Sequence, residues 1–333
     1  GLPAGYVQAL SAEEASLAAG LALPAPAWFY PGGGWVAPAA WVHHALNAPG
    51  VTLITGADVR ALKREGGTWV LLGTAGEVLA VAATVVLANA DSAQRLLSML
   101  GHTPWPLQHT RGQVTQFDLV HSLRLPVAGD GYAIPLPGAM LCGATRQDGD
   151  TDLRVRMEDH QHNVARLQHL TGLLPPADTA QWQGRAGLRL HSADNLPIAG
   201  AVPARCFAPG QRLDQVRLLP REPGLFALTA LGARGLTLAP LLGRLIAAQA
   251  TGAPWPLEQD LADAVDPARW IVRAARASTQ ADGPVHRQTA GPVGDQAGNE
   301  AGNEAGDRAD KEAGARKSSP VSPLADDAAK VQG

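Results

Sequence analysis

Apolar residues recur along this chain with two different periods, and segments of the two kinds alternate. Short apolar or β-branched runs bounded by glycine or proline predict strands. Longer stretches with apolar residues three or four apart predict helices over 38–46, 158–170 and 236–250. Strands and helices interleaved in this order indicate an α/β (α+β) architecture with more than one sheet. The predicted strands cover 51–55, 59–62, 68–72, 84–88, 111–120, 132–135, 140–144, 182–190 and 225–228.

The end of the chain has a different composition. Residues 278–333 contain nine acidic and six basic residues, no aromatic residue and no apolar period. Such a segment cannot bury enough apolar surface to offset the entropy lost on ordering. We therefore expect a disordered low-complexity tail over 278–333, after a folded part over 1–277.

Composition also excludes several classes of protein. The longest apolar stretches, such as 81–90, are far shorter than the roughly 20 residues that span a bilayer, so we expect no membrane contact. Cys142 and Cys206 form no CxxC pair, which fits a reducing compartment and predicts a cytoplasmic protein. Two close histidine pairs lack further ligands at a workable spacing, so no metal site is expected. The net charge of −3 neither requires nor excludes nucleic acid.

One glycine-rich segment matches the dinucleotide-binding pattern G-x-G-x-x-G/A. It is GGGWVA at 32–37, and Asp58 lies about 20 residues further on. A buried parallel strand should precede such a loop, but prolines at 24, 26 and 31 interrupt this stretch. Trp35 is also bulky for a position beside a pyrophosphate. We therefore interpret 32–37 as a tight turn before the helix over 38–46.

A second glycine-containing loop is more informative. The sequence GLFALTALGARGLTLAP at 224–240 predicts a short strand, a loop with two glycines and an immediate helix start. The free N–H groups and positive dipole end of a helix stabilise an electron-rich edge, such as the pyrimidine edge of a flavin. From this loop alone, an ordinary strand–helix connection is an equally good interpretation.

Two arginines, Arg185 and Arg189, lie upstream in GRAGLR near the end of a predicted strand. They could be surface charges, or they could aim a bidentate guanidinium at a substrate carboxylate.

Several motifs together resemble a known family. AGLR, NLPIAG and GLFALTALGARGLTLAP, in that order, resemble the closing half of the D-amino-acid-oxidase-like FAD oxidoreductases, which include glycine and sarcosine oxidases. The resemblance covers about 20–277 as separate motifs. Further segments are similar to one subfamily, the oxidoreductase part of the bifunctional tRNA 5-methylaminomethyl-2-thiouridine biosynthesis proteins (MnmC): YPGGGWVAPAAW, TVVLANA, RGQVTQ, GDGYAIPL, LCGATRQDGD and TGAPWPLEQDLADAVDPARWIVRAAR.

The resemblance implies a two-domain flavoprotein fold. An FAD-binding domain is expected from about 47–92 and 184–275, without its first βαβ unit, and a mixed-sheet substrate domain from about 20–46 and 93–183. Because the chain opens on Gly1 and lacks a dinucleotide loop, we expect it to be N-terminally truncated. The methyltransferase domain that uses S-adenosyl-L-methionine in this family is not in this sequence.

The resemblance also implies a reaction. The family removes the carboxymethyl group from 5-carboxymethylaminomethyl-(2-thio)uridine at the tRNA wobble position: FAD accepts a hydride, and hydrolysis yields glyoxylate and the 5-aminomethyl nucleoside. tRNA is then the expected partner, through an accessible nucleotide of the anticodon loop, and a monomer is expected. The alternatives are an FAD-dependent amine oxidase acting on free glycine or sarcosine, and an inactive fragment, because the main pyrophosphate site is missing.

Site residues follow from the same resemblance. Arg189 is expected to bind the glycine-like carboxylate of the substrate. Arg185 is the second candidate for this role, and a structural ion pair is its alternative. Tyr132 is expected to cap the substrate face. No general base is assigned, because hydride transfer needs a neutral amine. The expected FAD contacts are Gly232, Arg234, Gly235, Leu236 and Thr237 at the flavin ring, and Val59, Ala88 and Asn89 on the adenine and ribose side.

Overall fold

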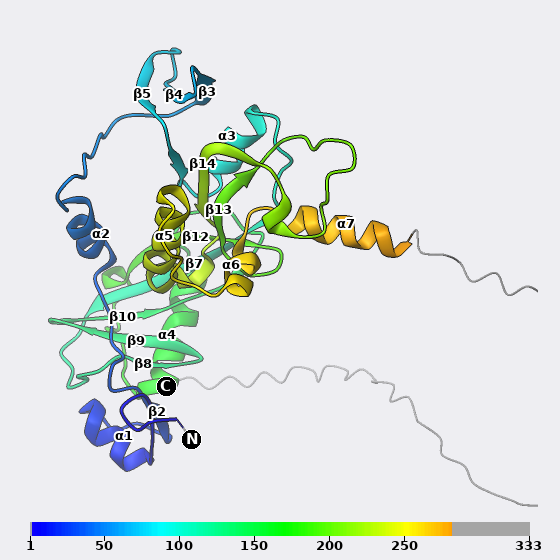
Figure 1. The fold of residues 1–333 in the computed structure, drawn as a ribbon. Coiled ribbons are helices and arrows are strands. Elements are labelled where there is room, and N and C mark those ends of the chain that lie inside the picture. Colours follow the sequence, from blue (N-terminus) through cyan, green and yellow to red (C-terminus); the bar gives the residue numbers. More distant parts are fainter. Residues whose placement is uncertain (1, 282–333) are drawn as a thin grey trace, which may run out of the picture. The chain divides into compact units, whose positions relative to one another are not determined.

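A computed structural model of the chain describes residues 2–281 (Figure 1). Its elements fall into four sheets with helices packed on them. In chain order the elements are β1 (Gln8–Leu10), α1 (Ala12–Ala19), β2 (Ala27–Phe29), α2 (Pro38–Leu46), β3 (Ala61–Glu65), β4 (Thr68–Leu72), β5 (Val78–Ala82), β6 (Val85–Leu87), α3 (Ser92–Met99), β7 (Leu107–Asp118), β8 (Val127–Gly129), β9 (Gly131–Leu136), β10 (Ala139–Gly143), β11 (Gln147–Asp148), α4 (Met157–Thr171), η1 (Thr179–Gln181), β12 (Gln183–Ser192), β13 (Ile198–Pro203), η2 (Val216–Leu218), β14 (Arg221–Thr229), η3 (Gly232–Arg234), α5 (Gly235–Thr251), α6 (Gln259–Val265) and α7 (Arg269–Ala281).

The largest sheet is built around β7. Its long strand pairs with β12 on one side and with β10 and β11 on the other, and β9 and β8 extend the sheet beyond β10. Neighbouring side chains of a strand point to opposite faces, so Phe117 and its cross-strand partner Met140 lie on one face. Both are buried in a cluster with Leu167 of α4. Helix α4 therefore covers that face of the sheet.

The contact between α4 and β7 also contains a buried polar network. Arg111 of β7 is fully buried, and its Nη1 donates to Oδ2 of Asp159 on α4 at 2.5 Å. Its Nη2 donates to the side-chain oxygen of Gln113 and to the carbonyl of Arg154. Asn163 of α4 donates to the Gln113 carbonyl at 2.9 Å. A buried charge is tolerated only when it is paired and hydrogen-bonded, and here it is both.

A smaller sheet, in the order β13-β14-β6, lies between two hydrophobic layers. Alternate residues of β14 enter different cores: Leu225 and Ala227 join Leu96 and Leu97 of α3, whereas Phe226 joins the cluster beneath α5. Strand β14 runs antiparallel to β13 and parallel to β6. A parallel pair needs a crossover connection, and here nearly half of the described chain lies between the two strands.

Most predicted elements are confirmed, and one is wrong. The helix over 38–46 is α2, and the predicted hairpin appears as β9 and β10 around Pro137-Gly138. The strand predicted over 51–55 is absent, because these residues are exposed and no neighbouring strand pairs with them. An extended segment without a partner cannot satisfy its backbone groups within a sheet. The strand predicted over 59–62 begins two residues later, as β3.

Other elements were not predicted. They are β1, α1, β2, β5, α3, β8, β11, β13, α6 and α7. Helix α7 continues to Ala281, four residues into the segment interpreted as a tail; the rest of that prediction lies outside the described residues. Among residues 2–281, no helix has the length and apolarity to cross a membrane. The division into FAD-binding and substrate domains stays a prediction.

Candidate active site

The candidate site begins where two parallel strands end. β6 and β14 pair from Val85–Leu225 to Leu87–Ala227, so their carboxyl ends lie at the same edge of the sheet. The Thr229 hydroxyl donates to the carbonyl of Ala90 at 3.0 Å and ties the two strand ends together. In open α/β sheets, ligands bind outside the carboxyl ends of parallel strands.

Backbone strain is concentrated near these strand ends. Across residues 2–281, three non-glycine residues have a left-handed backbone: Ala90 (φ 54°), Asn195 (φ 57°) and Ala230 (φ 57°). Each such conformation costs about 1–2 kcal/mol for an L-residue. Ala230 directly follows β14, Ala90 accepts the hydrogen bond from Thr229, and the Asn195 carbonyl accepts a hydrogen bond from Arg234 in the loop after β14. Strained residues persist where surrounding contacts hold them, commonly at functional sites.

The loop after β14 leads directly into helix α5. Its residues Gly232–Arg234 form a 3₁₀ turn, and α5 starts at Gly235. No side chain caps the amino end of α5. The first N–H groups of the helix are therefore available to a ligand with a negative or electron-rich edge.

A second wall of the site is the face of the large sheet opposite α4. Strand register places residues directly across from one another on one face. Arg189 lies opposite Thr110, Arg185 lies opposite Val114, and Tyr132 lies opposite Gly143. Thr110 and Val114 alternate with Arg111 and Gln113, which contact α4, so all three predicted substrate residues are on the open face.

Arg189 lies flat over a glycine. A Cβ atom added to Gly112 would be 2.5 Å from Nη1 of Arg189 and 2.8 Å from its Cζ. Only glycine therefore leaves room for the guanidinium in this position. Among the described residues no carboxylate pairs with Arg189, and the same holds for Arg185, whose alternative interpretation as a structural ion pair finds no partner there. A guanidinium without a carboxylate partner among the described residues can bind an anionic group in a bidentate way.

Tyr132 stands near Arg189 on this face. Burial raises the pKa of the Tyr132 hydroxyl, and the positive charge of Arg189 opposes that shift. The hydroxyl therefore remains a neutral hydrogen-bond donor at ordinary pH. Its oxygen would be 3.2 Å from a Cβ atom added to Gly143, so glycine gives the phenol room here too.

Two cavities border the loop. The smaller, about 390 Å³, is lined by Arg189 and His191 of β12, by Arg146 just before β11, and by residues 231–234 of the loop. The larger, about 870 Å³, is lined by Tyr132, by Trp35 and Trp41 of the segment around α2, and by Leu236 and Thr237 of α5. The first is lined by three arginines, counting Arg234, and the second is mainly apolar.

His191 has a fixed orientation in the smaller cavity. The Thr110 hydroxyl donates to Oδ1 of Asp148 at 2.7 Å, so Nε2 of His191, 2.9 Å away, donates to the Thr110 oxygen. An isolated backbone bridge also joins His191 to Leu231 of the loop. β12 and the loop after β14 are thus fastened together beside Arg189.

Comparison with known proteins shows which family the chain belongs to. The sequence model of the FAD dependent oxidoreductase family (DAO) matches residues 2–249. The chain belongs to this family. It is 42% identical over 289 residues to the tRNA 5-methylaminomethyl-2-thiouridine biosynthesis bifunctional protein MnmC of Methylibium petroleiphilum, and 39% identical over 294 residues to that of Paraburkholderia xenovorans. Both alignments cover 83% of this chain and 44% of the relative, so the chain spans less than half the length of these relatives.

Two solved structures have the same fold as this chain. Glycine oxidase from Geobacillus kaustophilus aligns with a TM-score of 0.61 and 26% identity over 78% of this chain and 66% of that one. L-proline dehydrogenase from P. horikoshii aligns equally well at 17% identity, which shows the shared fold alone. The predicted α/β flavoprotein fold and the resemblance to the D-amino-acid-oxidase-like family are confirmed.

The residues present fit one half of the family's cofactor, FAD. The uncapped start of α5, the loop over 231–234 and the surrounding arginines suit the pyrimidine edge of an isoalloxazine ring. No glycine-rich strand–turn–helix for the pyrophosphate occurs within residues 2–281. The segment at 32–37 is an exposed turn leading into α2, and the strands before it, β1 and β2, pair antiparallel. The interpretation of this segment as a turn before a helix is therefore confirmed.

The predicted FAD contacts lie at different places. Ala88 and Asn89 are exposed at the carboxyl end of β6, close in sequence to the strained Ala90. Val59 lies before β3, where it packs against the core around α3, and its carbonyl accepts a hydrogen bond from Arg95. The five predicted loop residues, Gly232, Arg234, Gly235, Leu236 and Thr237, line or adjoin the two cavities.

Sequence reasoning missed two residues of this wall. They are Gly112 and His191. Strand alternation from Arg111 could have placed Gly112 on the open face, but pairing with Arg189 depends on a register that the sequence does not show.

Proposed function

We propose that this chain carries the FAD-dependent removal of the carboxymethyl group from 5-carboxymethylaminomethyl-(2-thio)uridine at the tRNA wobble position. The products are the 5-aminomethyl nucleoside and glyoxylate, and tRNA is the partner. The chain acts as a monomer in this proposal. Its similarity to the MnmC relatives, together with the site on the open sheet face, supports the assignment.

The observation that carries the proposal is the unpaired Arg189 over Gly112, next to a neutral Tyr132. The substrate side chain, R–NH–CH2–COO⁻, is an N-substituted glycine. A guanidinium binds its carboxylate in a bidentate way, and the Tyr132 hydroxyl can donate one more hydrogen bond. This grip fixes the CH2 group relative to the loop after β14, and such positioning accounts for a large part of an enzyme's rate.

FAD, when bound, supplies the acceptor for the two electrons and one proton removed from the CH2–NH group. Release of the products then needs water: hydrolysis of the protonated carbon–nitrogen double bond gives the amine and glyoxylate. Arg189 holds the carboxylate throughout, and the half-buried walls formed by Val114, Leu141 and Tyr132 limit access of bulk water.

A second candidate function is the oxidation of free glycine or sarcosine. The structural likeness to glycine oxidase favours it, since a free amino acid presents the same carboxylate and amine. Against it stands the cavity of about 870 Å³ with Tyr132, Trp35 and Trp41 in its walls. That space far exceeds a glycine molecule and suits a nucleoside, whose base can stack on aromatic side chains.

Glyoxylate release decides between the two. The FAD-loaded protein is incubated with tRNA bearing 5-carboxymethylaminomethyluridine, and separately with sarcosine and glycine. We expect kcat/KM to be higher for the tRNA, and Arg189→Ala to abolish turnover of either substrate. Faster turnover of sarcosine than of tRNA would establish the second candidate, and absence of glyoxylate from both substrates would reject the reaction.

A further inference from the structure

An arginine without a partner lies beside the cavity of about 870 Å³. Val114 and Tyr132, which line this cavity, belong to the open face of the large sheet. Arg185 of β12 pairs directly with Val114, so its side chain lies next to that wall on the same face. Arg185 is exposed, and within residues 2–281 it has no hydrogen bond and no ion pair. Its guanidinium is therefore available to a ligand that enters the cavity.

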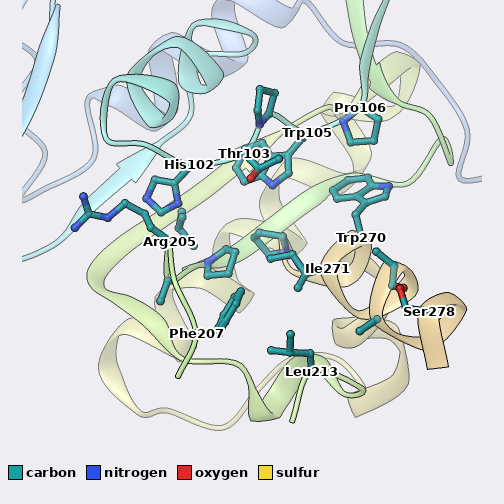
Figure 2. Close-up of a pocket in the computed structure, with 17 residues that line it drawn as sticks. His102, Thr103, Trp105, Pro106, Arg205, Phe207, Leu213, Trp270, Ile271 and Ser278 are labelled. Carbon is teal, nitrogen blue, oxygen red and sulfur yellow. The ribbon is translucent and has the colours of Figure 1, made fainter. Parts of the chain in front are cut away.

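Two other arginines beside cavities are already paired with carboxylates. Arg146 has an ion pair with Asp148 in the cavity of about 390 Å³. Arg205 lines a separate cavity of about 480 Å³, which has aromatic side chains in its walls, and it pairs with Glu222 (Figure 2). A paired guanidinium must give up its carboxylate before it can bind another anion in the same way. The open face therefore suits an anionic ligand better than the cavity in Figure 2.

The number of unpaired charges around the candidate site exceeds what a free amino acid would need. Arg185, Arg189 and Arg234 have no carboxylate partner among the described residues. In the proposed reaction the substrate carboxylate suits Arg189, and the pyrimidine edge of FAD suits the loop that contains Arg234. Glycine and sarcosine would leave Arg185 without a counter-charge. A nucleotide supplies one, because a phosphate accepts a bidentate contact from a guanidinium.

The spacing of Arg185 and Arg189 suits the two anionic groups of one nucleotide. Both lie on the open face of β12 with Gly187 midway between them, so their Cα atoms are about 13 Å apart. In the substrate, the aminomethyl arm extends from C5 of the uracil, on the ring edge that is turned toward the 5′ side of the ribose. The carboxylate and the 5′-phosphate therefore lie along the same side of the nucleotide, at its two ends.

We propose that Arg185 binds the 5′-phosphate of the wobble nucleotide while Arg189 binds the carboxylate of its side chain. Arg185 thereby makes the site selective for a nucleotide over a free amino acid. This phosphate site rests on the proposed function, because glycine and sarcosine carry no phosphate.

Binding of tRNA to the FAD-loaded chain at several salt concentrations tests the contact without any turnover. One phosphate contact in a single-stranded segment contributes about 0.7 to the slope of log K against log salt. Arg185→Gln should lower the slope by about that amount, and Arg185→Lys should retain it because the charge remains. Arg64→Gln is the matched control, since Arg64 is exposed, lies in β3 of a different sheet and has no ion pair within residues 2–281. Equal slopes for Arg185→Gln and Arg64→Gln would overturn the proposal.

Competition against tRNA identifies the phosphate. The competitors are 5-carboxymethylaminomethyluridine, its 5′-monophosphate and its 3′-monophosphate. In the unaltered protein the 5′-monophosphate should bind about ten-fold more tightly than the nucleoside, the effect of one charge-assisted contact. In Arg185→Gln the two should bind nearly equally. An equal loss of affinity for all three compounds would overturn the proposal, because Arg185 would then bind the carboxylate that they share. A preference for the 3′-monophosphate would overturn the assignment to the 5′ side.

Failure of the phosphate site and failure of the proposed reaction give different results. Glyoxylate release from tRNA, together with a salt slope that Arg185→Gln does not alter, rejects the phosphate site and leaves the reaction in place. A preference for the 5′-monophosphate that depends on Arg185, without glyoxylate release, supports the phosphate site and rejects the reaction. Absence of any tRNA binding rejects both. Circular dichroism confirms that each variant is folded.

Discussion

Gly112→Ala should disable substrate binding while leaving the fold intact. Gly112 does not have a left-handed backbone, so alanine is compatible with its conformation. The added Cβ would stand 2.5 Å from Nη1 of Arg189, whereas ordinary contact begins at 3.4 Å. The guanidinium must therefore move by about 0.9 Å, which a flexible side-chain end can do at little cost.

The expected loss follows from that displacement. A misplacement of about 1 Å at a reacting or binding group costs about 10²-fold in rate, or about 2.7 kcal/mol of transition-state stabilisation. The free energy of unfolding should change by no more than about 1 kcal/mol, the usual difference between glycine and alanine in a strand. Function and stability should therefore respond very differently to one methyl group.

The chain offers a matched control for this prediction. Gly187 pairs directly with Gly112 on the same face, and a Cβ atom there meets nothing within 4 Å. Glyoxylate release by FAD-loaded protein gives kcat/KM, and urea unfolding gives stability. We expect a fall of about 10²-fold for Gly112→Ala and little change for Gly187→Ala. Equal kcat/KM values for the two variants would refute the placement of Arg189 over Gly112. A large loss of stability in Gly112→Ala would show that the guanidinium cannot move aside for the added Cβ.

Three further predictions concern the rest of the structure. Asp159→Ala leaves the buried Arg111 without its carboxylate and should cost about 3–5 kcal/mol of unfolding free energy in urea titrations, with Asp159→Asn costing less; equal losses would argue against an electrostatic origin. Because burial lowers the pKa of His102, the unfolded state takes up a proton near pH 6.5 while the folded state does not. Stability should therefore decline as pH falls below about 6.5, and His102→Gln should reduce the slope of Tm against pH; an unchanged slope would contradict this. Burial raises the pKa of the Cys142 thiol to about 12, whereas Cys206 is exposed, so a thiol reagent should modify one cysteine in the native protein and both in urea.

The local pattern of apolar residues in the sequence was sufficient to predict many of the helices and strands. α5 was predicted because its apolar face repeats over four turns directly after a loop with two glycines. The same reasoning failed at 51–55, where β-branched residues predict a strand but no partner strand is present. Strand formation depends on pairing between distant segments, which local composition cannot reveal.

For the site, the sequence by itself identified the family and predicted roles for Arg189 and the loop after β14, since these are carried by contiguous motifs. Only the tertiary structure decided that Arg189 lies over Gly112 and near Tyr132, because that arrangement depends on the register of four strands, β12, β7, β10 and β9. A shift of one residue would turn every side chain of a strand to the opposite face, toward α4. The burial of His102, whose Nε2 has no hydrogen bond within residues 2–281, is likewise invisible in the sequence, since burial is a property of packed surfaces.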